Sequence, residues 1–346
     1  MAEKEESEKI KDKMDEAFRD NQKTKSIQKT LNQYFNDFIE DIEKGNRLTD
    51  SGKKYEKGTV KSLRGTLTQF EDFQKEKKRQ YNFDDINIDV HEEFMNFFND
   101  KNYSLNTIGR HIKNLKTIMR NSKEEGLHNN TEFERRAFRA HKTEVTNIYL
   151  DEKELAELFD LDLSNKIEWD LARDVFLIGC YTGLRYSDYS RINKDHITEE
   201  NGNKYIDIIT KKTGERVIIP MRREVEEILN KYDYNIPRTH EQKINKHIKK
   251  IGEKAGIEEM IEVESIKGGL KVNTKVPKHD LIKTHTARRS AATNMYLAGI
   301  PSIDIMKITG HTKESSFLKY ICITKDQTAS NLADHEYFNN NLKIAK

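Results

Sequence analysis

Cysteine and proline are scarce in this sequence. Its two cysteines, Cys180 and Cys322, are too few for a disulfide framework or a cysteine-rich zinc site. Four Pro and sixteen Gly among 346 residues exclude fibrous and proline-rich proteins. The longest nearly apolar run, Val175–Tyr181, is far shorter than the ~20 residues that cross a bilayer, and residues 1–24 contain no apolar stretch of a secretory signal. We therefore expect a soluble, cytoplasmic protein without a membrane partner.

A large excess of charge of one sign is also missing. The chain has 61 Lys and Arg against 59 Asp and Glu, so its formal net charge is only +2. The balance changes along the chain, because residues 101–150 hold ten basic and five acidic side chains and residues 209–289 hold nineteen and twelve. Solvated helix faces account for many of these charges, but a local excess of +5 and +7 is compatible with a polyanionic partner. Near-neutrality of the whole chain therefore does not exclude nucleic acid.

What the sequence does contain is helical periodicity. The length predicts two domains, because single cores rarely exceed about 250–300 residues. The charged segment over residues 1–24 is typical of a solvated helix or a partner-binding arm. The first predicted helices then lie around residues 27–42, 60–73, 90–98 and 105–119, the last with Ser104 as its N-cap. We expect a helical domain over residues 25–125 and, because the periodicity then breaks, a linker over residues 126–148.

The remaining chain mixes helices with short strands. Residues Tyr205–Thr210 and Arg216–Pro220, with a Lys-Thr-Gly turn between them, predict one β-hairpin, and Val263–Pro277 predicts a second. Further helices are predicted at 151–159, 169–181, 222–232, 241–255, 286–298, 301–309 and 314–321. The expected fold class is mainly α with small β-hairpins (α+β). We expect this second domain to span residues 149–335, followed by a tail over residues 336–346.

Several short motifs follow one another through this second region. Each residue alone has an ordinary interpretation as a helix cap, a solvated charge or a core aromatic. Together, two Arg, two His, one Lys and one Tyr form the set that attack on a phosphodiester needs without a metal. The motifs are Thr182-Gly183-Leu184-Arg185 with Asp188, Lys212 at the hairpin turn, His285-Thr286-Ala287-Arg288, Gly310-His311 and Tyr320.

Each residue type in this set has a chemical task. A Tyr hydroxyl can act as a covalent nucleophile, but a phenol of pKa ~10 needs cationic surroundings to lose its proton near neutral pH. Two guanidiniums bind phosphate oxygens bidentately and stabilise the charge of the transition state. A Lys ammonium can protonate a leaving 5′ oxygen, and a carboxylate such as Asp188 can orient a His or Arg. No acidic cluster typical of metal-dependent nucleases stands out, so we expect neither a metal nor another cofactor.

The combined motif resembles the catalytic signature of the tyrosine recombinases, the phage integrase family. Residues 182–188 resemble the first conserved box of that family, and residues 285–320 resemble the second. Lys212, directly before Thr213-Gly214, matches the hairpin lysine of the family. The helical domain before residue 150 resembles the family's SAM-like core-binding domain. The fragments TGLRYSD and HTARRSAATNMYLAGIP are similar to integrases of bacterial conjugative or mobilizable elements.

The resemblance implies a role for each residue of the set. Arg185 and Arg288 would clamp the scissile phosphate, Lys212 would be the general acid, and the two histidines would assist proton transfer. Tyr320 would attack to leave a 3′-phosphotyrosyl link and a free 5′-hydroxyl, so that rejoining needs no ATP. The implied catalytic residues are Arg185, Lys212, His285, Arg288, His311 and Tyr320, with Asp188 as the accessory carboxylate.

Three residues of this set have rivals of the same type elsewhere in the sequence. Lys211 precedes Lys212, and successive strand residues point to opposite faces, so only one lysine can face the phosphate. Arg289 follows Arg288, which alone completes the His-x-x-Arg spacing. The rival hydroxyls, which lack the spacing of Tyr320 from the second histidine, are Tyr296 and Tyr337.

The family resemblance also implies partners. It implies double-stranded DNA, a homo-tetramer on paired recombination sites, strand exchange through a Holliday junction, and possible accessory DNA-bending factors. A C-terminal helix over residues 325–346 would dock on its own or on a neighbouring protomer. Base-reading residues are not predictable from sequence. The candidate DNA contacts are Arg110, His111, Lys113, Lys116, Arg135 and Arg139.

The function that these observations favour is site-specific DNA recombination by the integrase or transposase of a mobile element. Two alternatives stay within the family, a chromosome-dimer resolvase and a DNA invertase. A third, from another class, is a non-catalytic DNA-binding protein of architectural role.

Overall fold

The computed structural model describes residues 29–323, 325–333 and 338. The described chain divides into two compact units. The first contains the residues up to Glu144 together with Glu264–Val272, and the second contains Val145–Val263 and the residues from Asn273 onward. The predicted segment 1–24, and the predicted tail 336–346 apart from residue 338, lie outside the described residues. Within the described residues, no helix is both long and apolar enough to cross a membrane.

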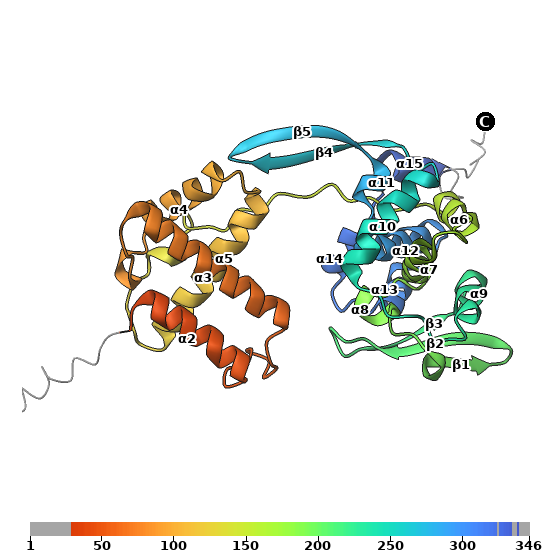
Figure 1. The fold of residues 1–346 in the computed structure, drawn as a ribbon, viewed down its shortest axis with the longest axis horizontal. Helices are drawn as coiled ribbons and strands as arrows, with labels where there is room; N and C mark the ends of the chain where they lie inside the picture. Colours follow the sequence, from red (N-terminus) through yellow and green to blue (C-terminus); the bar gives the residue numbers. More distant parts are fainter. Residues whose placement is uncertain (1–28, 324, 334–337, 339–346) are drawn as a thin grey trace, which may run out of the picture. The chain divides into compact units, whose positions relative to one another are not determined.

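The first unit is a helical domain with an aromatic core (Figure 1). Every helix predicted here is present, because each apolar stripe finds a partner stripe to cover it. The Ser104 hydroxyl accepts the backbone N–H of Thr107, which confirms its role as an N-cap. Rings of Phe70, Phe73 and Phe94 meet with centroids 5.0–6.1 Å apart, within the range of favourable aromatic pairs. The helices are α2 (Leu31–Lys44), α3 (Lys57–Lys77), α4 (Ile88–Asp100) and α5 (Leu105–Glu124).

The segment predicted as a linker is in large part not one. Phe133 and Phe138 are fully buried in the core of the first unit, and the Phe138 ring lies 4.5 Å from that of His91. The prediction failed because these two aromatics stand five residues apart, which matches neither helical nor strand periodicity. The division between the units falls at Glu144 and Val145.

His111 belongs to this core rather than to a surface. Its side chain is 4% exposed, its Nδ1 lies 2.9 Å from the Thr66 hydroxyl, and its ring stacks on Phe98 at 4.8 Å. Burial, together with the charge of Arg110, lowers the pKa of His111 to about 4. The imidazole is therefore neutral at pH 7 and serves as a hydrogen-bonded core side chain.

The neutral His111 predicts acid sensitivity of the fold. Below the ordinary histidine pKa of about 6.5, the unfolded chain binds a proton that the folded chain binds only near pH 4. The stabilisation is thus complete above pH 6.5 and is lost as the pH falls toward 4, by about 2 kcal/mol at pH 5. Denaturant unfolding of the wild type and of His111→Gln at pH 7.5 and pH 5 measures this difference. Equal pH dependence in both proteins would contradict the prediction.

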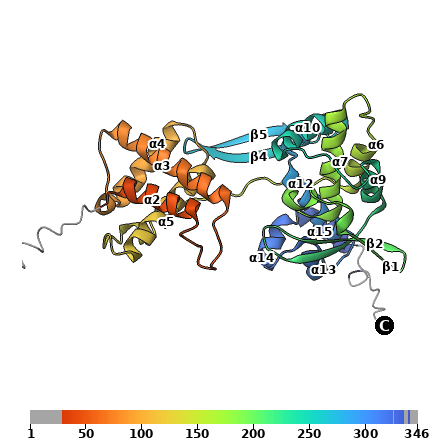
Figure 2. The ribbon, with the colours of Figure 1, turned by 60° about the horizontal axis from the view of Figure 1, so that its bottom comes forward.

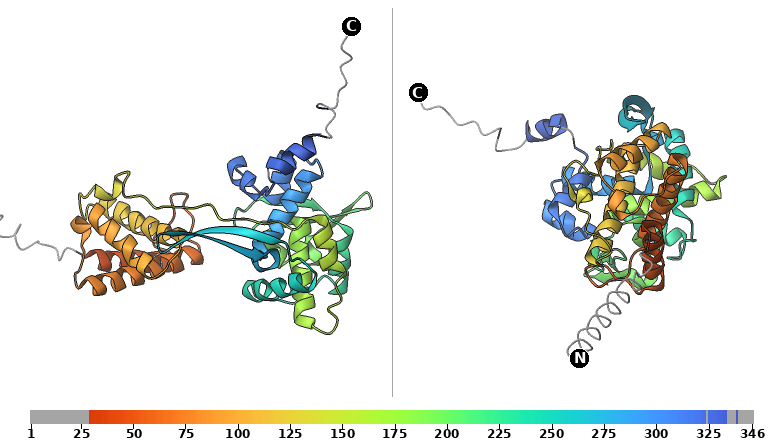
Figure 3. Two further views of the ribbon diagram at one scale, coloured as in Figure 1. Left: turned by 90° about the horizontal axis from the view of Figure 1, so that it is seen from above. Right: turned by 90° about the vertical axis from the view of Figure 1, so that its left-hand side faces the viewer.

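The second unit is built around α7, a helix that is buried on nearly all sides. It packs against α12 and α10 (Figure 2; Figure 3), which explains why its sequence is nearly apolar from Val175 to Tyr181. The helices of this unit are α6 (Glu152–Asp160), α7 (Ile167–Thr182), α8 (Tyr186–Tyr189), α9 (Arg223–Lys231), α10 (Glu241–Lys254), α11 (Lys278–Leu281), α12 (Thr284–Leu297), α13 (Ser302–Thr309), α14 (Glu314–Phe317) and α15 (Lys325–Ala333).

The predicted hairpin of this unit is part of a three-stranded sheet. Its strands β2 (Asn203–Ile209) and β3 (Arg216–Pro220) pair antiparallel, with Ile206 opposite Ile219 on the buried face. A further strand, β1 (Ile197–Glu200), pairs with β2 and was not predicted. Its sequence, Ile-Thr-Glu-Glu, has one apolar residue and therefore no alternation to recognise. The mainly helical fold with small antiparallel sheets is confirmed.

The second predicted hairpin is also present, but its tip belongs to the first unit. Strands β4 (Met260–Lys267) and β5 (Leu270–Pro277) form a two-stranded sheet (Figure 2). The N–H of Gly268 donates to the carbonyl of Tyr103, and Ser104 forms a β-bridge with Lys267. A side chain at Gly268 would meet Asn102 Oδ1 at 2.9 Å, so this turn needs glycine. Sequence reasoning had assigned the whole hairpin to the second domain.

Candidate active site

The first motif lies where α7 ends. Gly183 caps the helix with φ +68°, and a side chain here would approach Thr309 Cγ2 to 2.9 Å and Ala291 Cβ to 3.3 Å. Glycine is therefore required both by the backbone conformation and by the close packing of α12 and α13. The chain turns sharply at Gly183, and Arg185 then stands at the start of α8.

Arg288 on α12 is bound to this same turn. The residue is 1% exposed. Its Nη1 donates to the Gly183 carbonyl at 2.8 Å, and its Nη2 lies 3.0 Å from Nε2 of His311. Burial, followed by repulsion from Arg185, lowers the pKa of Arg288 to about 10, so it stays cationic at pH 7. The two motifs, about a hundred residues apart in sequence, thus meet through one buried side chain.

The two histidines are neutral members of the site. Burial first, and then the charges of Arg288 and Arg185, lower the pKa of His311 to about 3. Its Nδ1 lies 2.7 Å from the Thr309 hydroxyl, directly after Gly310 ends α13. His285, in the first turn of α12, lies at the outer side of the site. Partial burial and the nearby Arg289, Arg288, Arg185 and Lys212 lower the pKa of His285 to about 4.

Tyr320 stands between these histidines. Its hydroxyl lies 3.0 Å from Nε2 of His285, and its ring lies 4.8 Å from that of His311. In the tautomer of neutral His285 that carries its proton on Nδ1, Nε2 accepts this hydrogen bond and the phenol donates it. The backbone at Tyr320 is held by Thr293, whose hydroxyl donates to the Tyr320 carbonyl at 3.2 Å and accepts the N–H of Cys322 at 3.1 Å. The hydroxyl is thus placed against a group that can take its proton.

Asp188 is hydrogen-bonded to the turn that carries Lys212. Asp188 is fully buried, and its Oδ1 accepts the backbone N–H of Lys211 at 2.9 Å. This bond fixes the exposed turn between β2 and β3, where Lys212 stands. The charge of Lys212 is among those that lower the pKa of His285, which is compatible with Lys212 as the lysine that faces the site.

Two further residues lie at this site, Arg289 and Thr293, and the sequence motifs assigned neither of them to it. Arg289 is the nearby charge that most lowers the pKa of His285, and its guanidinium carbon lies 5.7 Å from the centre of the Tyr320 ring. Thr293 holds the backbone of Tyr320 as described above. Neither shows a signal in sequence, because a second Arg and one Thr on a helix are common. Tyr296, on the last turn of α12, is 42% exposed, and Tyr337 lies outside the described residues.

The charges gathered here suit an anion with several oxygens. Among the described residues, Arg185 Nη1 and Arg288 Nε are buried and have no hydrogen-bond partner in the protein. Buried guanidinium N–H groups without a partner are costly, so a ligand that accepts from them is expected. A phosphodiester offers two non-bridging oxygens in the geometry that guanidinium groups bind. Within the described residues, no group of three His, Cys, Asp or Glu side chains could hold a metal ion.

The predicted DNA contacts divide into exposed and engaged residues. Arg110 and Lys113 are exposed on α5, and Arg135 and Arg139 are exposed after it, with Arg135 paired to Glu132 at 2.8 Å. The prediction was wrong for His111, because its ring is buried in the core. It is also not supported for Lys116, because Nζ donates to the carbonyl of Phe138 at 2.6 Å and burial lowers the pKa of this lysine.

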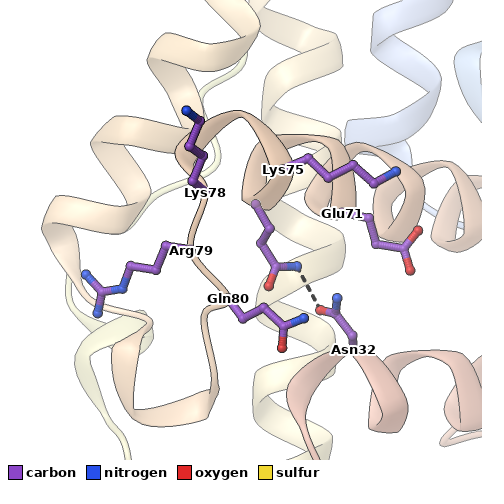
Figure 4. A pocket seen from close by; sticks show the side chains of 7 residues that line it. Asn32, Glu71, Lys75, Lys78, Arg79 and Gln80 are labelled. Carbon is purple, nitrogen blue, oxygen red and sulfur yellow. Dashed lines mark hydrogen bonds between the residues drawn. The ribbon is translucent and has the colours of Figure 1, made fainter.

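A cavity of about 590 Å³ in the first unit carries no comparable chemistry (Figure 4). Gln74 donates to Asn32 at 3.0 Å across it, and Lys75 pairs with Asp72. The Lys78 and Arg79 side chains extend in different directions, and Arg79 binds Asp85 at 2.8 Å. The basic groups around this cavity therefore do not converge on one point.

Two family models together match most of the chain. A model described as the phage integrase family matches residues 149–327, and one described as the phage integrase SAM-like domain matches residues 30–142. No curated protein sequence matches the chain.

Solved structures resemble this one at low sequence identity. The Tn1549 transposon integrase in complex with circular intermediate DNA has a TM-score of 0.60 and 15% identity, covering 88% of this chain and 99% of that one. A lambda integrase tetramer bound to a Holliday junction has a TM-score of 0.59 and 17% identity, covering 85% and 81%. The XerH site-specific recombinase bound to a palindromic difH substrate has a TM-score of 0.57 and 15% identity, covering 80% and 79%. At these identities the likeness shows the fold.

Proposed function

Because the chain belongs to the phage integrase family and is a tyrosine site-specific recombinase, we propose that it cuts and rejoins DNA through Tyr320. The observation that carries this assignment is the hydrogen bond of 3.0 Å between the Tyr320 hydroxyl and Nε2 of a neutral His285. A base within hydrogen-bond reach of a nucleophile is the geometry that general base catalysis requires. A non-catalytic DNA-binding protein would have no need of it.

The contacts suggest an order of events at the scissile phosphate. Arg185 and Arg288 bind the non-bridging oxygens, and their charge stabilises the pentacoordinate transition state. As the Tyr320 oxygen forms its bond to phosphorus, its proton passes to His285. The bond from phosphorus to the 5′ oxygen breaks, and Lys212 supplies the proton that this oxygen needs. A 3′-phosphotyrosyl link and a 5′-hydroxyl result.

Rejoining is the same reaction in reverse. A 5′-hydroxyl from another strand attacks the phosphotyrosyl link and gives its proton back to Lys212, and Tyr320 leaves with a proton returned by His285. One phosphodiester is made for each one broken, so neither ATP nor another energy source is consumed. His311, hydrogen-bonded to the buried Arg288, holds this guanidinium toward the phosphate throughout. Asp188 holds the lysine turn.

Double-stranded DNA is the proposed partner, and a mobile element the proposed context. The likeness to the Tn1549 transposon integrase on circular intermediate DNA supports an integrase or transposase. The likeness to a lambda integrase tetramer on a Holliday junction supports a homo-tetramer acting on paired sites. The likeness to XerH on difH keeps a resolvase as the second candidate. Arg110 and Lys113 on α5 and Arg139 are the proposed phosphate contacts.

A covalent capture experiment tests this function without knowledge of the target. The protein is incubated with a library of duplexes of random sequence that carry a nick, in buffer containing EDTA, and covalent protein–DNA adducts are isolated and sequenced. The expected result is an adduct that resists boiling in detergent, with one sequence motif enriched in it. A DNA-binding protein without cleavage activity gives no adduct, and adducts that form only after a divalent metal is added would contradict the proposed chemistry.

A further inference from the structure

The turn that carries Lys212 is held from outside the hairpin at two points. The first is the hydrogen bond from the Lys211 N–H to Asp188. The second comes from Arg191, one helical turn after Asp188, whose Nη2 donates to the carbonyl of Ile209, the last residue of β2. Both anchors thus reach the hairpin at the residues directly before Lys212. The resemblance to the family implied no role for Arg191.

Arg191 also faces Asp188 directly. Its Nη2 lies 3.6 Å from Oδ1 of Asp188, the same oxygen that accepts the Lys211 N–H, and its Nη1 lies 3.4 Å from Nε2 of His196. The Asp188 side chain is completely buried, whereas that of Arg191 is 29% exposed. A buried carboxylate is stable only when cations and hydrogen-bond donors surround it. Arg191 supplies a cation at the oxygen that holds the turn.

The turn also has hydrogen bonds of its own and one buried residue. The N–H of Thr210 donates to the Glu215 carbonyl at 2.8 Å, and the Thr210 hydroxyl lies 2.7 Å from that of Thr213. Lys211 and Lys212 are exposed, whereas Thr210 is 1% exposed. Contacts inside the turn fix its shape, and the anchors at Lys211 and Ile209, together with the buried Thr210, set its direction relative to the rest of the unit.

We propose that Arg191 is a positioning residue for the general acid: through Asp188 and the Ile209 carbonyl it holds the turn so that Lys212 reaches the leaving 5′ oxygen. This inference rests on the function proposed above. In the step concerned, the Tyr320 oxygen bonds to phosphorus, the bond from phosphorus to the 5′ oxygen breaks, and one proton moves from Lys212 to that oxygen. Displacement of a reacting group by about 1 Å costs about 10²-fold in rate.

A change of leaving group tests this assignment. The DNA site found by covalent capture is made as a suicide duplex in two forms, with oxygen or with sulfur at the 5′ bridging position. Cleavage of both forms by Arg191→Met is compared with cleavage by the wild type. A thiolate leaves without a proton, so a defect in the general acid disappears on the sulfur substrate. We expect single-turnover cleavage to fall about 10²-fold on oxygen and to recover to within about threefold of wild type on sulfur. Lys212→Met should show the same pattern.

Control variants separate a positioning role from an effect on DNA binding or folding. Arg216→Met removes an arginine from the same hairpin, where it pairs with Asp207 at 2.9 Å, and should cleave both substrates at the wild-type rate. The double variant Arg191→Met/Lys212→Met should be no slower than Lys212→Met alone, because both changes disable one step. If the sulfur substrate restores the cleavage rate of Lys212→Met but not that of Arg191→Met, the inference is overturned. The loss of cleavage in Arg191→Met would then come from a defect in DNA binding or folding. Wild type without any adduct overturns the proposed function itself.

Discussion

Replacing Tyr320 by Phe is expected to abolish the covalent protein–DNA complex. The ring and its contacts with His311 remain, but the oxygen that attacks phosphorus is gone, and no other described hydroxyl takes its place beside His285. Removal of a nucleophile costs about 10⁴-fold or more in rate, so adduct should fall below detection on a suicide duplex. Affinity for DNA, measured by gel shift, should stay within about twofold, because the loss of one hydroxyl changes no phosphate contact of a Lys or Arg side chain.

The matched control is Tyr296→Phe. This removes the same hydroxyl from a rival tyrosine whose side chain is 42% exposed at the end of α12, and it should form adduct as the wild type does. Tyr337→Phe serves the same purpose for the other rival. The assignment of the nucleophile is wrong if Tyr320→Phe still accumulates adduct, or if either control variant loses it. Thermal melting of each variant shows whether the fold has been kept.

The second large effect is expected at Arg288. Arg288→Lys keeps a positive charge, but an ammonium cannot donate to the Gly183 carbonyl, contact His311 and clamp a phosphate oxygen at the same time. Loss of a donor to the transition state costs about 10²–10³-fold, so single-turnover cleavage should fall by that amount. Arg222→Lys is the comparison: its arginine pairs with Glu152 and Glu224, and the change should leave cleavage unaltered.

Stability measurements complete the test at Arg288. The Gly183 carbonyl and His311 lose a buried partner, and an unsatisfied buried polar group costs about 1–3 kcal/mol. Melting temperature should therefore fall in Arg288→Lys but not in Arg222→Lys. Cleavage that survives within threefold in a folded Arg288→Lys protein would show that this guanidinium does not bind the reacting phosphate.

The grouping of the candidate site residues was predictable because these residues stand in short motifs. Gly183 and Arg185, or His285 and Arg288, are local in sequence, and local spacing carries over directly into local geometry. The DNA-facing surface was less predictable. His111 is neutral at pH 7 mainly because it is buried, and on α5 it falls on the face that packs against Thr66 and Phe98. Composition showed a basic stretch, but packing decided which of its residues remain free.

Long-range contacts were the other limit. Phe133 and Phe138 enter the core of the first unit from a segment without periodicity, and the tip of the β4–β5 hairpin belongs to that same unit. Arg191 looks like any surface arginine after a short helix until β2 is placed beside it. These contacts join residues that are far apart in the sequence, whereas hydrophobic periodicity is detected within windows of about 10 to 20 residues.

The mainly helical class, most elements, the family and the candidate site residues follow from the sequence alone, because amphipathic periodicity and motif spacing are properties of neighbouring residues. The surroundings of those candidate residues depend on the tertiary structure. It buries Arg288 against Gly183, holds His285 and His311 neutral beside Tyr320, and fixes the lysine turn through Asp188. Burial and nearby charges set the protonation state of each group, and neighbouring segments set the direction of its side chain. Burial and these neighbours arise only when distant segments pack together.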